Sequence, residues 1–432
     1  MMGQKSPGRI SPGLAFGLCL ILITGVFAAT AAPSPFYELQ QRQWGFPAAL
    51  MTVAVAIYAV TFLAALLTIG SLADYVGHRF VIGVAMLAQA TSMLLFISAS
   101  SIEWVILGRA AQGLGMGAVV GALGACITLF APGKSAVKLG PTVAAVSPQA
   151  GSALGSLTAG WAIQSLYQPG PLVFGCYAIL FAIGGLAAFF LPGERPRRAR
   201  IWSSLRPSLT VPLAARSAFW RAVPVIFAGW MLGALYLSLV PLLVREMLGG
   251  ASPLTGGITI AAFSAFGAVA GLAAGRLSAR NAATWGGSVM LVGALIAVLA
   301  TLVGSFPLFA AATVLGALGY GGSNVGAIRT IIPLVDPAHR SEVFSAIYVV
   351  GYVAFGLPVI LAGLAADSLG VVTVTFWYSV GTAALTLFGT VMVARTGAVV
   401  RNTASGALPN GGNPLATTDA HGLEQKLTSP PV

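Results

Sequence analysis

The sequence predicts an all-α integral membrane protein with twelve transmembrane helices in two pseudo-symmetric six-helix bundles, and three observations predict it. The 432-residue chain is 57% hydrophobic and 7% charged, whereas an average soluble protein carries roughly 25% charged residues. Apolar runs long enough to cross a bilayer as helices recur along its length. Similar short sequences also recur at a nearly constant offset in the two halves.

The predicted spans, in chain order, are 14–32, 47–69, 80–99, 103–130, 139–162, 172–191, 222–244, 255–275, 285–303, 307–331, 342–366 and 371–394. They divide the chain into a cytoplasmic N-terminus (1–13), a first bundle (14–191), a basic cytoplasmic linker (192–221), a second bundle (222–394) and a disordered cytoplasmic tail (395–432). The linker carries seven arginines, and the tail is rich in Asn, Gly, Thr and Pro.

The first span follows Lys5 and Arg9 and ends in "AATAAP" at 28–33, a pattern that also marks a cleavable signal peptide. The apolar run is long for a signal-peptide core, and the repeat described below pairs this span with the seventh. We therefore expect the first span to be retained.

Lysine and arginine predict the orientation of the chain. With a cytoplasmic N-terminus and alternating spans, 19 of the 22 basic residues fall inside, Arg42 and Arg245 fall outside, and Arg109 lies within a span. This asymmetry follows the positive-inside rule and predicts an inner (plasma) membrane protein with both termini cytoplasmic. The net charge of +12 therefore needs no nucleic-acid partner, because inner-leaflet lipid attracts such residues.

The loop after the second span reads "GSLADYVGHRF" at 70–80. It resembles the signature Gly-x-Leu-Ala-Asp-Arg-x-Gly-Arg-Arg/Lys of the major facilitator superfamily, and the chain resembles the drug-efflux-like branch of that family. The matching residues are Gly70, Leu72, Ala73, Asp74, Gly77 and Arg79, whereas Tyr75 and His78 each replace an arginine.

The resemblance implies that Gly70, Asp74, Gly77 and Arg79 form a gate. In the family, the matching aspartate meets the start of the eleventh span, which here lies near 341–343. A helix N-terminus stabilises a carboxylate by roughly 0.3–2 kcal/mol. The family also implies an acidic partner at the inner end of the fourth span, but residues 119–135 contain none.

The fourth span contains "VILGRAAQGLGMGA" at 105–118, which resembles the family pattern Arg-x-x-Gln-Gly. The resemblance implies that Arg109 and Gln112 contact substrate or couple transport to protons. An arginine at mid-membrane costs about 2.5–3.5 kcal/mol on insertion scales, so it should face a cavity or a partner. Snorkelling to the outer headgroups is the alternative.

In the fifth span, "GSALGSLTAG" at 151–160 only weakly resembles the Gly-x-x-x-Gly-Pro…Gly-Gly run of efflux members, because Ser156 and Ala159 replace the proline and a glycine. Support for antiport is reduced accordingly.

The two halves of the chain carry matching pairs of residues. Gly115 corresponds to Gly319, and Ala159–Gly160 corresponds to Ala362–Gly363. The shared offset predicts a duplicated six-helix unit, as in many transporters.

Polar and aromatic residues near the span centres predict a central cavity. The family places spans 3, 6, 9 and 12 outside such a cavity, and Gln89 in the third span is an exception to the polar pattern. The candidate cavity-lining residues are Tyr58, Gln149, Trp230, Tyr236, Tyr320, Asn324, Tyr348 and Tyr352.

No Asp, Glu, Lys or His lies near a span centre, which favours a neutral or anionic substrate over a cation. The chain is predicted to be a secondary active transporter working by rocker-switch alternating access, in efflux, with nutrient uptake as the alternative. Proton coupling through Glu38 or Glu103 near Arg109 and uncoupled transport both stay open.

A polytopic enzyme and a channel are rival classes. The three histidines lie in separate segments, Cys19, Cys126 and Cys176 fall inside spans, and no catalytic or nucleotide-binding motif occurs. We therefore expect no enzyme activity, no cofactor and no metal site. A monomer in the lipid bilayer is expected, with a small-molecule substrate.

Overall fold

The computed structural model describes residues 10–70, 72–132, 136–192, 210–250, 252–336 and 339–405, and these residues are helical with no strand. In chain order the helices are α1 (Pro12–Ala31), α2 (Pro33–Trp44), α3 (Ala48–Ile69), α4 (Ala73–Val76), α5 (His78–Ile97), α6 (Ile102–Phe130), α7 (Ala136–Ser165), α8 (Pro169–Ala188), α10 (Leu213–Ser238), α11 (Val240–Met247), α12 (Pro253–Ala274), α13 (Ala279–Val303), α14 (Phe306–Ile331), the 3-10 turn η1 (Ile332–Leu334), α15 (Arg340–Leu369) and α16 (Val371–Ser405).

Among the described residues, 11 helical segments are long and apolar enough to cross a membrane. Helix α7, with 30 residues, is a twelfth long helix; it is less apolar because it carries Lys138, Pro148, Gln149 and several serines. The predicted all-α membrane fold with two six-helix bundles is confirmed.

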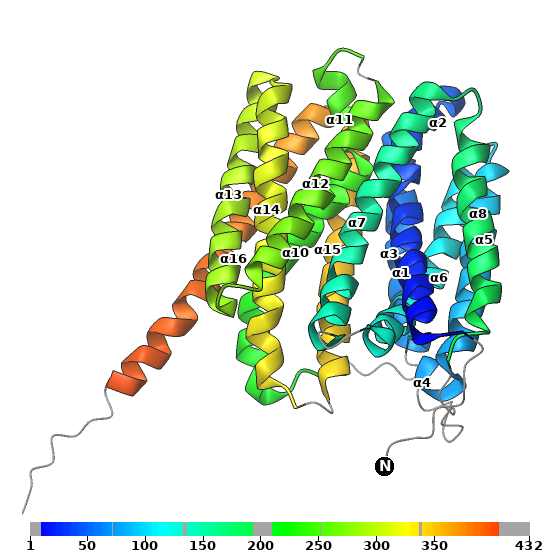
Figure 1. Ribbon diagram of the computed structural model, residues 1–432. Coiled ribbons are helices and arrows are strands. Elements are labelled where there is room, and N and C mark those ends of the chain that lie inside the picture. Colours follow the sequence, from blue (N-terminus) through cyan, green and yellow to red (C-terminus); the bar gives the residue numbers. More distant parts are fainter. Residues whose placement is uncertain are drawn as a thin grey trace, which may run out of the picture. The chain divides into compact units, whose positions relative to one another are not determined.

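The long helices form two groups that lie side by side (Figure 1). Helices α1, α3, α5, α6, α7 and α8 make the first bundle, and α10 with α12 to α16 make the second. The bundles touch mainly through two helix pairs, α7 with α12 and α3 with α15. These pairs are equivalent under the exchange of the two halves, because each joins the fifth long helix of one bundle to the second of the other.

The close helix contacts repeat in the same way. A Cβ at Gly115 would lie 3.0 Å from the Ala85 carbonyl oxygen of α5, and a Cβ at Gly319 would collide with Met290 of α13. Both glycines sit on the fourth long helix of their bundle and face the third. The offset seen in the sequence therefore corresponds to a repeated packing contact, which small residues permit in membranes.

Two helices start or end differently from the sequence expectation. The first span continues beyond 32 as α2, because the Ala32 N–H still bonds the Ala28 carbonyl and Pro33 then interrupts the hydrogen-bond ladder without ending the helical course. Helix α10 begins at Leu213, inside the segment expected to be linker. Residues 1–9 and 193–209 lie outside the described residues.

The C-terminal segment from Arg395 forms a unit of its own. Its first residues, 395–405, are helical as the end of α16, whereas we expected a disordered tail from 395. Residues 406–432 lie outside the described residues.

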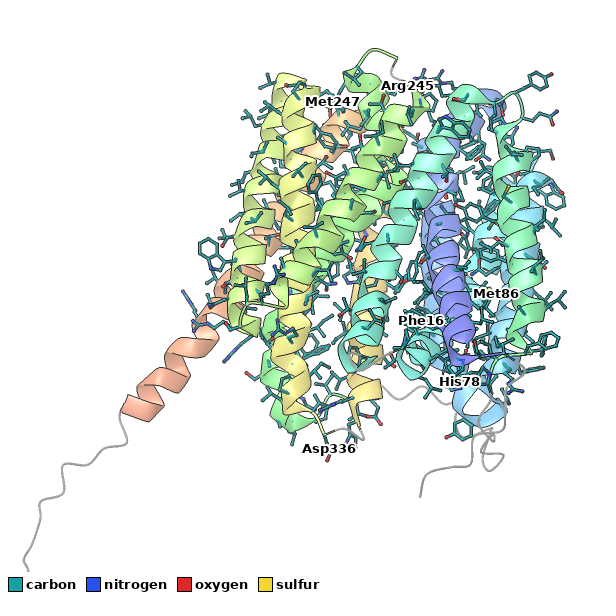
Figure 2. The ribbon with its side chains drawn as sticks, viewed as in Figure 1. Phe16, His78, Met86, Arg245, Met247 and Asp336 are labelled. Carbon is teal, nitrogen blue, oxygen red and sulfur yellow. The ribbon has the colours of Figure 1, made fainter. Side chains whose placement is uncertain are left out.

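The helices of the two bundles run between two opposite ends. Arg245 and Met247 mark one end, called here the Arg245 end, where α2 and α11 also lie; His78 and Asp336 mark the opposite end, called the His78 end (Figure 2). Large apolar side chains such as Ile21, Leu87 and Trp285 are exposed on the outward faces of the bundles, where lipid tails would cover them.

Candidate functional site

A cavity of about 400 Å³ lies between the two bundles, which is within the usual size of small-molecule sites. Its walls come from α1, α3, α6 and α7 of the first bundle and from α10, α12, α14 and α15 of the second. None of the described lining residues belongs to α5, α8, α13 or α16. These four are the third and sixth long helices of each bundle, which the family resemblance places outside.

All eight residues selected at the span centres line this cavity: Tyr58, Gln149, Trp230, Tyr236, Tyr320, Asn324, Tyr348 and Tyr352. Their contact with a substrate stays a prediction. Gln89 does not line it; the side chain is buried and its Nε2 donates to the Gln112 carbonyl at 3.0 Å, so it joins α5 to α6.

The phenylalanines that line the cavity were not predicted from the sequence. Phe62 follows Tyr58 by four residues and Phe355 follows Tyr352 by three, and residues at these spacings share a helix face. This spacing could have indicated that the phenylalanines share the tyrosine face. However, phenylalanine is apolar, so its presence at a span centre does not show whether it faces lipid or the cavity.

The aromatic rings form two clusters. In the first, Phe62 stacks on Tyr352 with ring centroids 4.2 Å apart, and Trp230 lies 5.0 Å from Tyr352, so α3, α10 and α15 meet. In the second, Phe263 stacks on Tyr236 at 4.1 Å and lies 5.6 Å from Tyr320, which joins α10, α12 and α14. Planar apolar surface therefore dominates the cavity wall.

Among the described residues that line the cavity, two polar side-chain atoms are buried without a hydrogen-bond partner, the Trp230 Nε1 and the Asn324 Oδ1. The tryptophan atom is a donor and the asparagine atom is an acceptor. By contrast, the Tyr236 hydroxyl donates to Thr313 Oγ1 at 2.8 Å. Both unpartnered atoms are enclosed by protein and have almost no accessible surface, so the cavity itself does not reach them.

Arg109 is only 3% exposed and lies behind the cavity wall. Its Nε donates to the Tyr37 hydroxyl at 2.6 Å, and its Nη1 donates to the Thr30 carbonyl at 2.7 Å and to Gln112 Oε1 at 2.8 Å. The guanidinium carbon also lies 5.8 Å from the centroid of the Tyr58 ring. The arginine is therefore held inside the protein by neutral groups rather than snorkelling to headgroups.

Gln112, one turn along α6, completes this arrangement, because its Nε2 donates to the Ala29 carbonyl at 2.9 Å. Neither Arg109 nor Gln112 is among the residues that line the cavity, whereas Thr30 and Tyr58, which contact Arg109, are. Through these hydrogen bonds, Arg109 and Gln112 connect α6 to α1 and α2.

Glu38 does not pair with Arg109. Its carboxylate forms ion pairs with Arg42 of the same helix and with Arg245 of α11, the latter at 3.3 Å. Because α11 belongs to the second half of the chain, Glu38 links the two bundles. Glu103, at the start of α6, is exposed; neither acid provides a buried counter-charge for the arginine.

The gate residues of the sequence analysis lie at the His78 end. Gly70 ends α3, and Gly77 joins α4 to α5 with φ +97°, a conformation that favours glycine. The Arg79 Nε and Nη2 are buried without a hydrogen-bond partner among the described residues. The side chain of Asp74 lies outside the described residues.

Polar contacts join the bundles at the Arg245 end. The carboxylate of Asp367, near the end of α15, accepts from the backbone N–H groups of Ala48 at 2.7 Å and Ala49 at 3.2 Å. At the same end, the Ser252 Oγ, just before the start of α12, donates to the Gln164 Oε1 near the end of α7 at 2.6 Å. No local sequence pattern connects Asp367 to residue 48, because the two lie 319 positions apart.

Within the part of the chain that the structure describes, the cysteines and histidines form no recognisable centre. Cys19 and Cys126 are buried, Cys176 is exposed, and no group of three or more His, Cys, Asp or Glu among the described residues could hold a metal ion.

Two related helix bundles around a shared internal cavity define the class of this protein as a membrane transporter. Residues 14–304 match the family model of the Major Facilitator Superfamily, and the chain belongs to that family. A search of curated protein sequences gives no match.

Solved transporter structures share the fold. A bacterial homologue of the human lysosomal transporter Spinster, inward-facing and occupied, aligns with a TM-score of 0.68 and 13% identity over 92% of this chain and 99% of that one. The nucleoside transporter NupG aligns at 0.67 and 14% over 88% and 100%. The human organic anion transporter MFSD10 aligns at 0.62 and 16% over 89% and 100%.

Proposed function

We propose that the chain exports a small neutral or anionic organic molecule by rocker-switch alternating access. The observation that carries this proposal is the cavity shared by both bundles, together with polar contacts between the bundles at the Arg245 end. Such a cavity opens to one side or the other when the halves rock about it. The names of two structural neighbours, a nucleoside transporter and an organic anion transporter, are compatible with this substrate range.

The orientation proposed here follows the positive-inside rule. It puts the His78 end and both termini in the cytoplasm and the Arg245 end outside, in the plasma membrane. The conformation described would then be closed to the outside. The functional unit is a monomer whose halves, 14–191 and 222–394, move as bodies about the linker 192–221.

Two sites are proposed to control the cycle. Asp74, with Gly70, Gly77 and Arg79, would latch the cytoplasmic end when α15 approaches α4, since α15 begins at Arg340 shortly after Asp336, the residue that marks this end. Arg109 with Gln112 would couple substrate movement to protons, acting through Tyr58 and Thr30, which reach both the arginine and the cavity.

A growth screen tests the proposal. The chain is expressed in a host lacking its major efflux systems, and toxic compounds and nutrients are tested, with Arg109→Ala and Asp74→Ala as variants of matched expression. Raised resistance that both substitutions abolish supports efflux. Nutrient rescue or lowered resistance would replace efflux by uptake, and no change for any compound would refute transport of this class.

A further inference from the structure

The turn between α12 and α13 carries exposed arginines at a corner of the second bundle. We propose that Arg276 and Arg280 bind the phosphate headgroup of an anionic phospholipid there, in preference to a zwitterionic phospholipid. The positive-inside rule places basic residues on one side of a membrane but assigns none of them a lipid site. The proposal does not depend on the transport function, because a lipid site forms on the outside of the bundle.

The corner lies where a lipid-facing helix ends. Helix α12 starts next to Ser252, which contacts Gln164 at the Arg245 end, so the turn after α12 lies toward the His78 end. Helix α13 then runs along the outer edge of the second bundle (Figure 1), and none of the described cavity-lining residues belongs to it. Its exposed side chains include Val292 and Leu295, which lipid tails would cover. The headgroups of those lipids would therefore lie beside the turn.

The corner is positively charged because its helices carry no acid. Residues 247–335, which include α12, α13 and α14, contain no Asp or Glu, and neither does α16. Arg276 and Arg280 are both exposed. The Arg280 Nη2 donates to the Ala394 carbonyl, so this guanidinium lies at the junction of α13 and α16. Basic groups between membrane helices at headgroup level bind anionic headgroups, and the guanidinium fork matches a phosphate.

A third arginine holds the backbone of the turn. The Arg329 Nη1, from α14, donates to the Ala274 carbonyl at 2.8 Å and to the Leu277 carbonyl at 3.1 Å. Carbonyls at the end of a helix lack partners within the helix, and the arginine supplies one. Arg329 is therefore a positioning residue, because it fixes the segment that carries Arg276.

The corresponding turn of the first bundle has a different charge. The sequence "GSLAD" at 70–74 matches "GRLSA" at 275–279 with an offset of 205. In the second turn Arg276 takes the position of a serine, and an alanine takes the position of Asp74. A carboxylate repels a phosphate, so the second turn suits an anionic headgroup better than the first.

Trp285 lies close enough to the turn to report on the lipid there. Its side chain is 67% exposed. It is six residues beyond the start of α13, which is about 9 Å along the helix axis. Tryptophan rings of membrane proteins are enriched at the membrane–water interface. A quencher on a lipid bound at the corner would therefore reduce the fluorescence of Trp285.

The test uses the full chain in phosphatidylcholine nanodiscs that contain a minor fraction of one brominated lipid. The three probes are brominated phosphatidylglycerol, phosphatidylethanolamine and phosphatidylcholine. The Trp285 signal is the difference in fluorescence between the chain and its Trp285→Phe variant. Each arginine near the surface favours an anionic lipid about fivefold, so we expect phosphatidylglycerol to be preferred about 5- to 25-fold over both zwitterionic lipids, and less at high salt.

Variants assign the two contacts. Arg276→Gln and Arg280→Gln should each reduce the preference about fivefold, and the double variant should abolish it. Arg276→Lys and Arg280→Lys keep the charge and should keep most of the preference, which separates loss of charge from damage to the turn. Arg216→Gln removes an exposed arginine near the start of α10 and should leave the preference unchanged.

Equal quenching by all three lipids, or quenching by phosphatidylethanolamine as strong as by phosphatidylglycerol, would overturn the inference. So would a preference that the double variant retains, or that Arg216→Gln lowers as much as Arg276→Gln does, since either would reflect the general charge of the chain. If the double variant does not fold, Arg276→Gln alone decides. None of these results bears on transport, which the growth screen judges through Arg109→Ala and Asp74→Ala.

Discussion

At the scale of single residues, the notable feature is a buried arginine without an ionic partner among the described residues. Arg109 is satisfied by a tyrosine hydroxyl, a backbone carbonyl and an amide oxygen, and aromatic faces lie near it. These hydrogen bonds depend on the planar guanidinium, whose several N–H donors point in fixed directions, and lysine has no such group. Tyr37, the acceptor at 2.6 Å, stands on α2, a helix that the sequence analysis treated as an external loop.

Arg109→Lys is expected to reduce transport at least about tenfold while leaving ligand affinity within about twofold. The charge is retained, but a single ammonium cannot reach Tyr37, Thr30 and Gln112 together, so α6 loses its attachment to α1 and α2. The cavity wall is unchanged because Arg109 does not line it.

Flux in proteoliposomes and equilibrium dialysis on the same preparation measure the two quantities separately. Arg216→Lys, at an exposed position near the start of α10, is the matched control. A large loss of affinity in Arg109→Lys would mean that the arginine contacts the ligand directly.

At the scale of helices, α3 receives its N-terminal cap from the other half of the chain. The residue before α3 is Pro47, which has no capping side chain, and the Asp367 carboxylate bonds the first two N–H groups of the helix instead. Such a bond satisfies donors that a helix leaves free and places a negative charge at the positive end of the dipole. Under the proposed rocking movement, this contact would break when the Arg245 end opens.

Asp367→Asn should favour opening of the Arg245 end. Loss of the charge from a cap of this kind is worth about 1 kcal/mol, which corresponds to a roughly fivefold shift of the equilibrium. Spin labels on α2 and α11, read by pulsed dipolar spectroscopy, measure the population of the open state. Glu246→Gln removes the same charge from an exposed position at the same end and should leave the distance distribution unchanged; an equal shift in both variants would point to general charge rather than to the cap.

The helices themselves were predictable from the sequence because hydropathy and span length act locally. The spans 47–69, 103–130 and 307–331 agree closely with α3, α6 and α14. Helix α2 was not predicted because it begins with Pro33 and Pro35, and prolines usually indicate a loop. Proline is nevertheless tolerated in the first turn of a helix, which is where both lie.

The site was predictable only in part. Tyrosines and amides at span centres stood out, because polar groups in a membrane must face something other than lipid. The partners could not be predicted, since the Arg109–Tyr37 contact joins residues 72 positions apart and Asp367 reaches Ala48 across 319 positions. Nothing local in the sequence carries that information.

At the scale of the whole molecule, two bundles share a cavity and touch through few helices. The α3–α15 and α7–α12 pairs meet through small residues: Gly356 lies against Ala56 and Ala59, and Gly160 against the start of α12. Small residues let helix backbones approach closely, and larger rings also cross the α3–α15 contact, where Phe62 stacks on Tyr352. Under the proposed rocking movement, these are the contacts that would have to separate.

A covalent link between the bundles should stop this movement. A Cβ at Gly356 would lie 3.9 Å from the Cβ of Ala56, which is within the ~3.5–4.5 Å that a disulfide requires. We expect the Ala56→Cys/Gly356→Cys pair, in a background with the exposed Cys176 replaced by serine, to lose transport on oxidation and to regain it on reduction. Each single-cysteine variant should transport under both conditions.

Because the link leaves the cavity wall intact, the oxidised protein should still bind ligand. Full transport with the bond quantitatively formed would mean that α3 and α15 stay together throughout the cycle and that the bundles do not rock apart along this pair.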